Sequence, residues 1–160
     1  MQIKIGRAWR GFAAVTALAG SFALAGNAFA GECPAGQMNP DATKNAGHAA
    51  KAVTDTVLAQ IDLGGEKVAL KGHNMRVRKL VIQPGGIVPW HSHDDRPALI
   101  FVQQGEIVEY ASNCADPIVH KAGDIRPEVF GTSHWWKNLG KETVILYVGD
   151  IRKDPNDKHM

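Results

Sequence analysis

The sequence predicts an all-β fold, built as a sandwich or barrel of short antiparallel strands. Two observations support this class: short extended runs recur along the chain with turn-forming residues between them, and no helical run of useful length competes with them. The chain has 160 residues, of which 44% are hydrophobic. That length and composition are typical of one globular domain.

The first 30 residues are predicted to be a secretory signal peptide. A cationic start with Lys4, Arg7 and Arg10 leads into an apolar run over 11–26, and Ala28-Phe29-Ala30 matches the small-x-small pattern read by signal peptidase. An uncleaved membrane anchor is the alternative, because the apolar run is about as long as the shortest spanning helices. Cleavage predicts a periplasmic or secreted protein that keeps no stable membrane anchor.

The charge of the mature chain is close to neutral. The signal carries three of the 18 Lys and Arg residues and no acid, which leaves 15 cations against 16 Asp and Glu. Nothing in this balance indicates a nucleic acid or an acidic membrane as partner. The expected partner is a small-molecule substrate or ligand.

Both cysteines, Cys33 and Cys114, lie in the mature chain and are predicted to form a disulfide. The bond would tether the N-terminal arm to the loop that holds Cys114, and closing a loop of about 80 residues stabilises a fold by about 4 kcal/mol. A structural role is favoured over a redox role, because the sequence has no Cys-x-x-Cys.

The N-terminal arm is predicted over residues 31–52, with one short helical turn near 46–52. Proline and glycine residues recur in it and interrupt any long helical or strand pattern: Pro34, Gly36, Pro40 and Gly47. The barrel is predicted over 53–150 and a polar tail over 151–160. The expected extended segments are 53–63, 66–70, 75–83, 98–103, 106–110, 118–121, 125–127 and 143–148. A tight turn at Gln104-Gly105 is expected to make 98–103 and 106–110 neighbouring partners.

A candidate metal site lies between Pro84 and Gly105. His91 and His93 are one residue apart on a segment that reads as extended, so their side chains point to the same face. Imidazole is the commonest side-chain ligand of transition metals. A third ligand has to come from elsewhere in the chain, and His134 is the candidate.

Two motifs resemble those of the cupin superfamily, in particular the single-domain cupin-2-like conserved barrels. The first consists of Gly85, five residues, His91-x-His93 and then Gly105. The second consists of Gly123-Asp124, Pro127, Gly131, His134 and Asn138. The resemblance implies a small antiparallel jelly-roll barrel with a metal in its mouth or middle, and a homodimer paired through sheet faces.

The chain departs from the cupin pattern at Ala98, where cupins of this type usually carry a glutamate. The resemblance is therefore to the three-histidine variant, with one divalent transition metal ion at His91, His93 and His134. Iron, manganese, nickel, copper and zinc all accept imidazole, so the sequence leaves the identity of the metal open. Losing the carboxylate raises the Lewis acidity of the ion and frees a coordination position.

Four residues are predicted to line the substrate pocket: Arg96, Ala98, Ile100 and Trp136. Trp136 shares its strand face with His134, so it is either an aromatic wall of the pocket or a simple core residue. Arg96 either binds a substrate carboxylate or pairs with Asp94 or Asp95.

The leading functional hypothesis is oxygenase-type chemistry on a small organic substrate. One alternative is a non-catalytic module that binds a metal or a small ligand. Another is a metal-assisted isomerase or lyase acting on a sugar or organic acid, which gains support if Arg96 or Arg78 points inward. Glu106 and Glu109 are the carboxylates nearest to a possible general-base role, but both are expected to face solvent on a hairpin.

Overall fold

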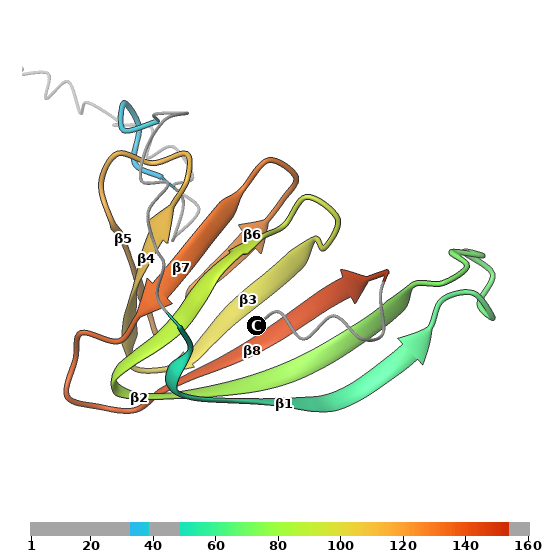
Figure 1. Cartoon of the computed structure of the whole chain (residues 1–160), viewed down its shortest axis with the longest axis horizontal. Coiled ribbons are helices and arrows are strands. Elements are labelled where there is room, and N and C mark those ends of the chain that lie inside the picture. The colour runs from blue at the N-terminus through green and yellow to red at the C-terminus, as the bar shows by residue number, and fades with distance from the viewer. Residues whose placement is uncertain (1–32, 39–48, 154–160) are drawn as a thin grey trace, which may run out of the picture.

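The computed structural model describes residues 33–38 and 49–153, and these residues form an all-β structure (Figure 1). The strands are β1 (Lys51–Asp62), β2 (Asn74–Ser92), β3 (Ala98–Gln104), β4 (Glu106–Ala111), β5 (Ile118–Lys121), β6 (Ile125–Glu128), β7 (Ser133–Lys137) and β8 (Val144–Arg152). Within the described ranges no helix is long and apolar enough to cross a membrane. The predicted signal peptide, most of the N-terminal arm and residues 154–160 of the predicted tail lie outside these ranges.

All strand pairs are antiparallel, and the sheet curls into a barrel-like shell of the predicted jelly-roll type (Figure 1). The strand order is β5-β4-β7-β2-β8-β3-β6, with β1 added to β2. β2 joins the two halves of the shell: residues 74–82 pair with β8, and residues 87–92 pair with β7. Between them, Gly86 passes so close to the Gln83 carbonyl that a Cβ would lie 2.7 Å from it.

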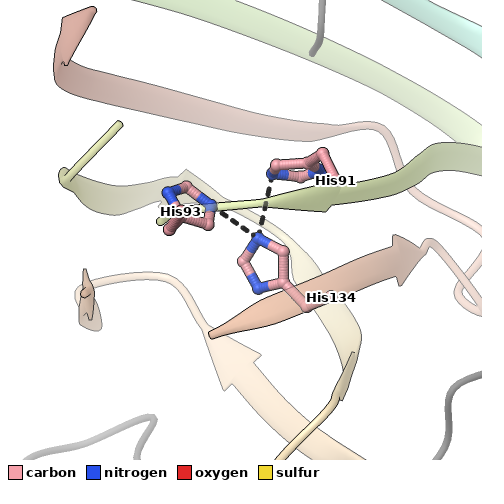
Figure 2. A group of neighbouring side chains, drawn as sticks. All are labelled: His91, His93 and His134. Carbon is pink, nitrogen blue, oxygen red and sulfur yellow. Dashed lines mark hydrogen bonds between the residues drawn. The ribbon is translucent and has the colours of Figure 1, made fainter. Parts of the chain in front are cut away.

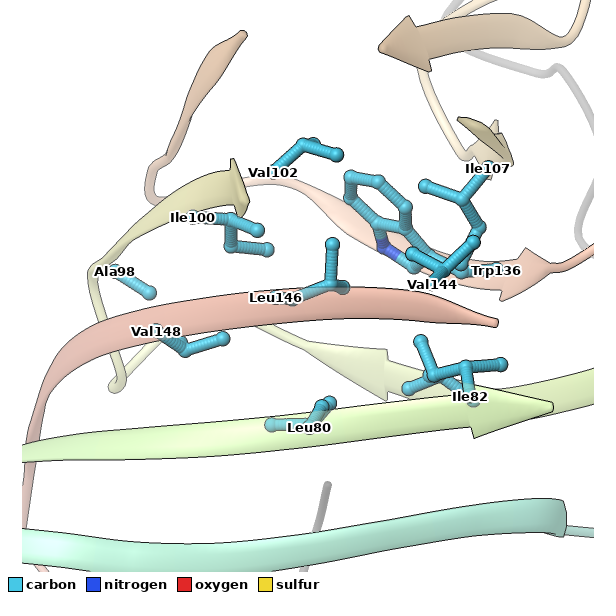
Figure 3. Packing of buried hydrophobic residues seen from close by; sticks show 11 residues of the cluster. Leu80, Ile82, Ala98, Ile100, Val102, Ile107, Trp136, Val144, Leu146 and Val148 are labelled. Carbon is cyan, nitrogen blue, oxygen red and sulfur yellow. The ribbon is translucent and has the colours of Figure 1, made fainter. Parts of the chain in front are cut away.

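The core fills the space inside the curled sheet (Figure 3). Strict alternation on β8 sends Val144, Leu146 and Val148 inward while the residues between them stay half-exposed. The remaining members of this cluster come from four other strands: Leu80, Ile82, Val88, Ala98, Ile100, Val102, Ile107 and Trp136. Each large aliphatic side chain buried in this way contributes about 1.5–3 kcal/mol.

The expected hairpin around Gln104-Gly105 is wrong. β3 pairs with β8 and β6, whereas β4 pairs with β5 and β7, and no ladder between the described residues joins β3 to β4. Gly105 adopts a φ of 82° and lies against Val144, where a Cβ would come within 3.0 Å of the valine Cγ2. The turn therefore carries the chain from one half of the shell to the other.

Three other segments differ from expectation. β2 continues beyond Gln83 to Ser92, and residues 66–70 form turns instead of a strand. β8 continues beyond Val148, so that Ile151 and Arg152 belong to the sheet and not to a polar tail. The extension has a physical reason, because Asp150 is buried and forms ion pairs with arginines on β2.

The predicted disulfide between Cys33 and Cys114 is present, with a Cα–Cα distance of 5.6 Å. The two half-cystines pack beside Ala111 and Ile118 in a small apolar cluster. A backbone hydrogen bond from the Ala115 N–H to the Gln37 carbonyl, 2.8 Å long, adds a second tie. Residues 33–38 are thus held against the end of β4.

Candidate metal centre

A β-bulge in β2 turns the first two histidines into the shell. Inward side chains on β2 occupy even positions from Arg76 to Val88, and uninterrupted alternation would leave His91 on the outer face. Between the pairs Val88↔Trp136 and His91↔His134, β2 advances three residues while β7 advances two. This extra residue reverses the phase of the strand, so His91 points inward.

His93 lies just beyond the end of β2 and is held there by the loop before β7. Its backbone N–H donates a 2.9 Å hydrogen bond to the Thr132 carbonyl. Asp94 accepts a hydrogen bond from the Gly131 N–H at 2.9 Å, which fastens the same two loops together. His134 itself lies on β7, directly opposite His91 in the ladder.

The three histidines converge through their Nε2 atoms (Figure 2). The His134 Nε2 atom is 3.0 Å from the Nε2 atom of His93 and 3.0 Å from that of His91. Two imidazoles bound at about 2.1 Å to one ion, at right angles to each other, have nitrogens about 3.0 Å apart. The spacing therefore fits three ligands on one face of a transition metal ion.

The tautomers of the three rings follow from the partners of their Nδ1 atoms. His91 Nδ1–H donates to the Pro89 carbonyl at 2.9 Å, and His93 Nδ1–H donates to the Arg96 carbonyl at 2.8 Å. His134 Nδ1–H donates to the Glu109 carboxylate at 2.7 Å. In the neutral rings all three Nε2 atoms then carry lone pairs that face a common point. Such an arrangement is repulsive on its own and favours a bound cation.

Electrostatics keep two of these rings neutral. Burial lowers the pKa of His91 well below its usual value, and the charge of a protonated His134 would lower it further. Burial also lowers the pKa of His93, from 6.5 to about 3, again with a contribution from His134. Metal ligation requires neutral imidazole, so protons compete little for these two ligands near neutral pH.

Glu109 is buried behind His134, and the expectation that it faces solvent is wrong. Its carboxylate accepts the His134 Nδ1–H at one oxygen and the His120 Nε2–H at the other, at 2.8 Å. Burial alone would raise the pKa of Glu109, but the hydrogen bonds from His120 and His134 outweigh it and hold the pKa well below its usual range. The carboxylate orients His134 for ligation. The sequence does contain a signal for this position: Glu109 is two residues after Ile107 on the same strand, so both side chains point to the same face.

A second buried carboxylate, Glu128 on β6, lies next to this group. It is directly opposite Ala98 in the β3–β6 ladder, and its Oε1 atom is 3.4 Å from His134 Nδ1. Burial raises the pKa of Glu128 to about 7, and the negative charge of Glu109 acts in the same direction. The cross-strand position means that a carboxylate is present beside Ala98, although on another strand than in the usual cupin pattern.

Glu109, Glu128 and His134 lie close enough together to suggest a second ion site. Two observations argue against it. The His134 Nδ1 atom carries a proton that Glu109 accepts. The Arg126 guanidinium already supplies a cation, with its Nε atom 3.3 Å from an oxygen of each carboxylate. We therefore assign this group to the support of the three-histidine centre.

The cavity at the histidines has mostly apolar walls. They are formed by Arg78, Leu80, Val88, His91, His93, Ile100, Trp136, Leu146 and Val148. The volume open to the centres of water molecules is about 10 Å³, which is the room of about one water. The wider space, including the part that opens to solvent, is about 310 Å³. The centre is thus accessible only to a small ligand.

The four residues predicted to line the pocket divide into two pairs. Ile100 and Trp136 are on the cavity wall, and the Trp136 indole N–H lies 3.2 Å from both ring nitrogens of His134. Arg96 and Ala98 are buried but are not part of the wall. The charged residue that does line the cavity is Arg78 on β2. No carboxylate from the described part of the chain is on the wall.

The comparisons with known proteins identify the fold. No curated protein matches the sequence. An uncharacterized conserved protein with a double-stranded beta-helix domain, from Klebsiella pneumoniae subsp. pneumoniae, is 21% identical with a TM-score of 0.51, over 64% of this chain and 78% of that chain. KdgF from Halomonas sp. is 12% identical with a TM-score of 0.50, over 69% and 90%.

A third solved structure, a recombinant oxalate oxidase in complex with glycolate, is 21% identical with a TM-score of 0.50. The match covers 66% of this chain and 53% of that chain, so this chain spans about half of it. The family model described as "Cupin domain" (Cupin_2) matches residues 78–149, which include all three histidines. Sequence model and structural neighbours agree, and residues 78–149 of this chain form a cupin domain.

Proposed function

We propose that this protein is an exported, metal-dependent cupin that carries out oxygenase-type chemistry on a small organic substrate at a mononuclear centre. One observation carries the proposal: three histidine Nε2 atoms converge on the wall of a small, mostly apolar cavity, with His134 Nε2 3.0 Å from each of the other two. The donor set is neutral, so a divalent ion bound there keeps its full charge and has coordination positions left for substrate and dioxygen.

Residues of the chain have separate tasks in this proposal. His91, His93 and His134 hold the ion, and Glu109 fixes the ring of His134 so that its lone pair faces the centre. Trp136 and the aliphatic wall restrict the space beside the ion and limit the entry of water. The ion, when bound, supplies Lewis acidity and, if it is iron, manganese, nickel or copper, redox chemistry.

The direct test is elemental analysis of the purified mature protein beside His91→Ala, with His73→Ala as the control. His73 is not part of the histidine group, and its ring is hydrogen-bonded to the Lys71 carbonyl. We expect about one transition metal per chain in the wild type and the control, and a clear loss in His91→Ala. Oxygen uptake with enols, diketones and thiols then tests the chemistry. Equal metal content in all three proteins would refute the ligand assignment.

A non-catalytic metal-binding or ligand-binding module is the second candidate. It is favoured by one observation, the lack of any carboxylate on the cavity wall among the described residues. Without an inner base, proton transfer would have to rely on the substrate or on water. A protein that holds stoichiometric metal and binds small ligands, yet consumes no oxygen with any of the three compound classes, would support this candidate.

We further propose that the protein is a homodimer paired through the outer face of the sheet formed by β2, β8, β3 and β6. Large apolar side chains are exposed there, including Met75, Val77, Leu99, Phe101 and Ile125. Phe101 is flanked in the ladders by Ile125 and Tyr147, so the patch is continuous. Sedimentation analysis should give a dimer, and Phe101→Lys should give a monomer that keeps its bound metal. A monomeric wild type at micromolar concentration would contradict the proposal.

Export to an oxidising compartment is part of the same proposal. The disulfide between Cys33 and Cys114 is typical of exported proteins. Mass spectrometry of the protein recovered from the periplasm or medium should show a chain that begins at Gly31. A chain that retains residues 1–30 would point to the membrane-anchor alternative.

A further inference from the structure

Among the described residues, Arg78 is the one charged side chain, apart from the histidines, on the cavity wall. It is on β2, two residues before Leu80, and its side chain points into the shell and is almost fully buried. An arginine in an apolar wall is costly unless each of its donors has a partner. The partners of Arg78 therefore indicate what the wall is built to bind.

Two carboxylates hold the guanidinium of Arg78 in one orientation. Its Nη1 atom is hydrogen-bonded to Asp55 on β1, and its Nη2 atom is 3.2 Å from Asp150 Oδ2 on β8. Asp150 is in turn fixed by two hydrogen bonds from Arg76, at 2.7 and 3.0 Å. The guanidinium plane is thus set by two neighbouring strands before any ligand arrives.

The third guanidinium nitrogen of Arg78, Nε, is left over. This atom is buried and has no hydrogen-bond partner among the described residues. An unmade hydrogen bond at a buried charged group is unfavourable, and native structures rarely keep one without reason. A ligand in the cavity that offers an oxygen acceptor would complete the set.

The charges around the cavity favour an anion as that ligand. Arg76 and Arg78 are balanced by Asp55 and Asp150. Imidazole ligates a metal ion in its neutral form, so a divalent ion at the centre would add two positive charges that no side chain of the wall compensates. In a small, mostly apolar cavity such an excess attracts anions strongly.

Resting on the proposed function, we propose that the substrate is a small aliphatic organic acid whose carboxylate is bound jointly by the metal ion and by the Nε–H of Arg78. A carboxylate offers two oxygens, one for each cation. The aliphatic remainder is accommodated by the apolar wall, including Leu80 and Ile100. The small cavity, in which about 10 Å³ is open to the centres of water molecules, favours an acid of a few carbon atoms over a larger one.

Binding of acetate and propionate to the zinc-loaded protein tests this assignment. Zinc is diamagnetic and redox-inactive, so titration calorimetry and NMR report binding without turnover. We compare wild type with Arg78→Lys, which keeps the positive charge beside Asp150 but has no Nε–H. The matched control is Arg152→Lys, the same substitution at a buried arginine at the end of β8 that does not line the cavity. We expect at least tenfold weaker acetate binding in Arg78→Lys and less than a twofold change in the control.

A second measurement on the wild type alone covers the case in which Arg78→Lys fails to fold. With arginine labelled at Nε, one Nε–H resonance should shift and gain protection from exchange as acetate saturates the protein. Unchanged arginine Nε–H resonances, or equal acetate affinity in Arg78→Lys and wild type, would overturn the assignment of Arg78. Failure of the wild type to retain zinc would instead overturn the proposed metal centre, so the two failures can be told apart.

Discussion

Replacing Glu109 by glutamine should weaken metal binding without altering any of the three ligands. The Glu109 carboxylate accepts the N–H of His134 at 2.7 Å and the N–H of His120 at 2.8 Å. A glutamine amide has only one oxygen, so one of these two N–H groups would face an NH₂ donor. If His134 loses its acceptor, its proton is no longer fixed on Nδ1, and protonation at Nε2 blocks ligation.

The expected magnitude follows from the role of such partners. Loss of a carboxylate that orients a metal-bound histidine typically costs 10–100-fold in metal affinity, which corresponds to about 1.4–2.7 kcal/mol. The unpaired buried donor should also lower the free energy of unfolding of the metal-free protein by about 1–3 kcal/mol. Competition with a chromophoric zinc chelator measures the first quantity, and urea unfolding in the presence of EDTA measures the second.

Glu106→Gln is the matched control for this experiment. Glu106 is on the same strand, exposed, and only 3.7 Å from Lys121 in a surface ion pair, which contributes about 0–1 kcal/mol. It should leave zinc affinity unchanged. A Glu109→Gln protein that folds and binds zinc within twofold of wild type would refute the argument that Glu109 fixes the tautomer of His134.

Three further predictions concern stability. The double substitution Cys33→Ser and Cys114→Ser opens a loop with a sequence separation of 81 residues. It should lower the free energy of unfolding by about 4.5 kcal/mol. A loss below 1 kcal/mol in urea unfolding would mean that the disulfide does not stabilise the fold. Gly105→Ala places a Cβ 3.0 Å from Val144 at a φ of 82°. It should destabilise the fold by about 1–3 kcal/mol and lower the melting temperature by several degrees. An unchanged melting temperature would contradict the close packing at Gly105. In the metal-free protein, folding raises the pKa of Glu128 from 4.5 to about 7. Between these pH values the folded state holds a proton on Glu128 that the unfolded state has lost. Glu128 therefore stabilises the fold fully below pH 4.5, and this stabilisation is lost as the pH rises through 7. Glu128→Gln should therefore gain up to about 3 kcal/mol relative to wild type between pH 4.5 and pH 8, measured by urea unfolding. An equal difference at both pH values would show that folding does not raise the pKa of Glu128.

The sequence predicts the barrel well because its information is local. Alternation marks most strands, and the cupin motifs indicate where His91, His93 and His134 lie relative to one another. The inward orientation of these side chains is harder to predict from the local sequence. The alternation that runs from Arg76 to Val88 has the opposite phase to His91, and only the bulge between them reconciles the two.

The surroundings of the centre were harder to predict, because they depend on which strands are neighbours. The turn at Gly105 suggests a hairpin, and a glutamate on a hairpin is usually solvated. The barrel instead places β4 beside β7, which brings Glu109 to the back of His134. Likewise, nothing local connects Glu128 with Ala98, since these residues are opposite each other only through the β3–β6 ladder. Because Glu109 shares a strand face with Ile107, the sequence could have placed it inside the barrel. That His134 is its partner could be predicted only by knowing that β4 pairs with β7.

The pairing of His91 with His134 in one ladder has a consequence for assembly of the fold. The two residues are separated by 43 positions in the chain, and the ladder between β2 and β7 is short. A slip of one residue between these strands would turn His134 to the outside and leave the ion with an incomplete set of ligands. In the proposed metal centre, an ion would add its binding energy to the correct alignment alone, so metal binding would favour the correct pairing of β2 with β7.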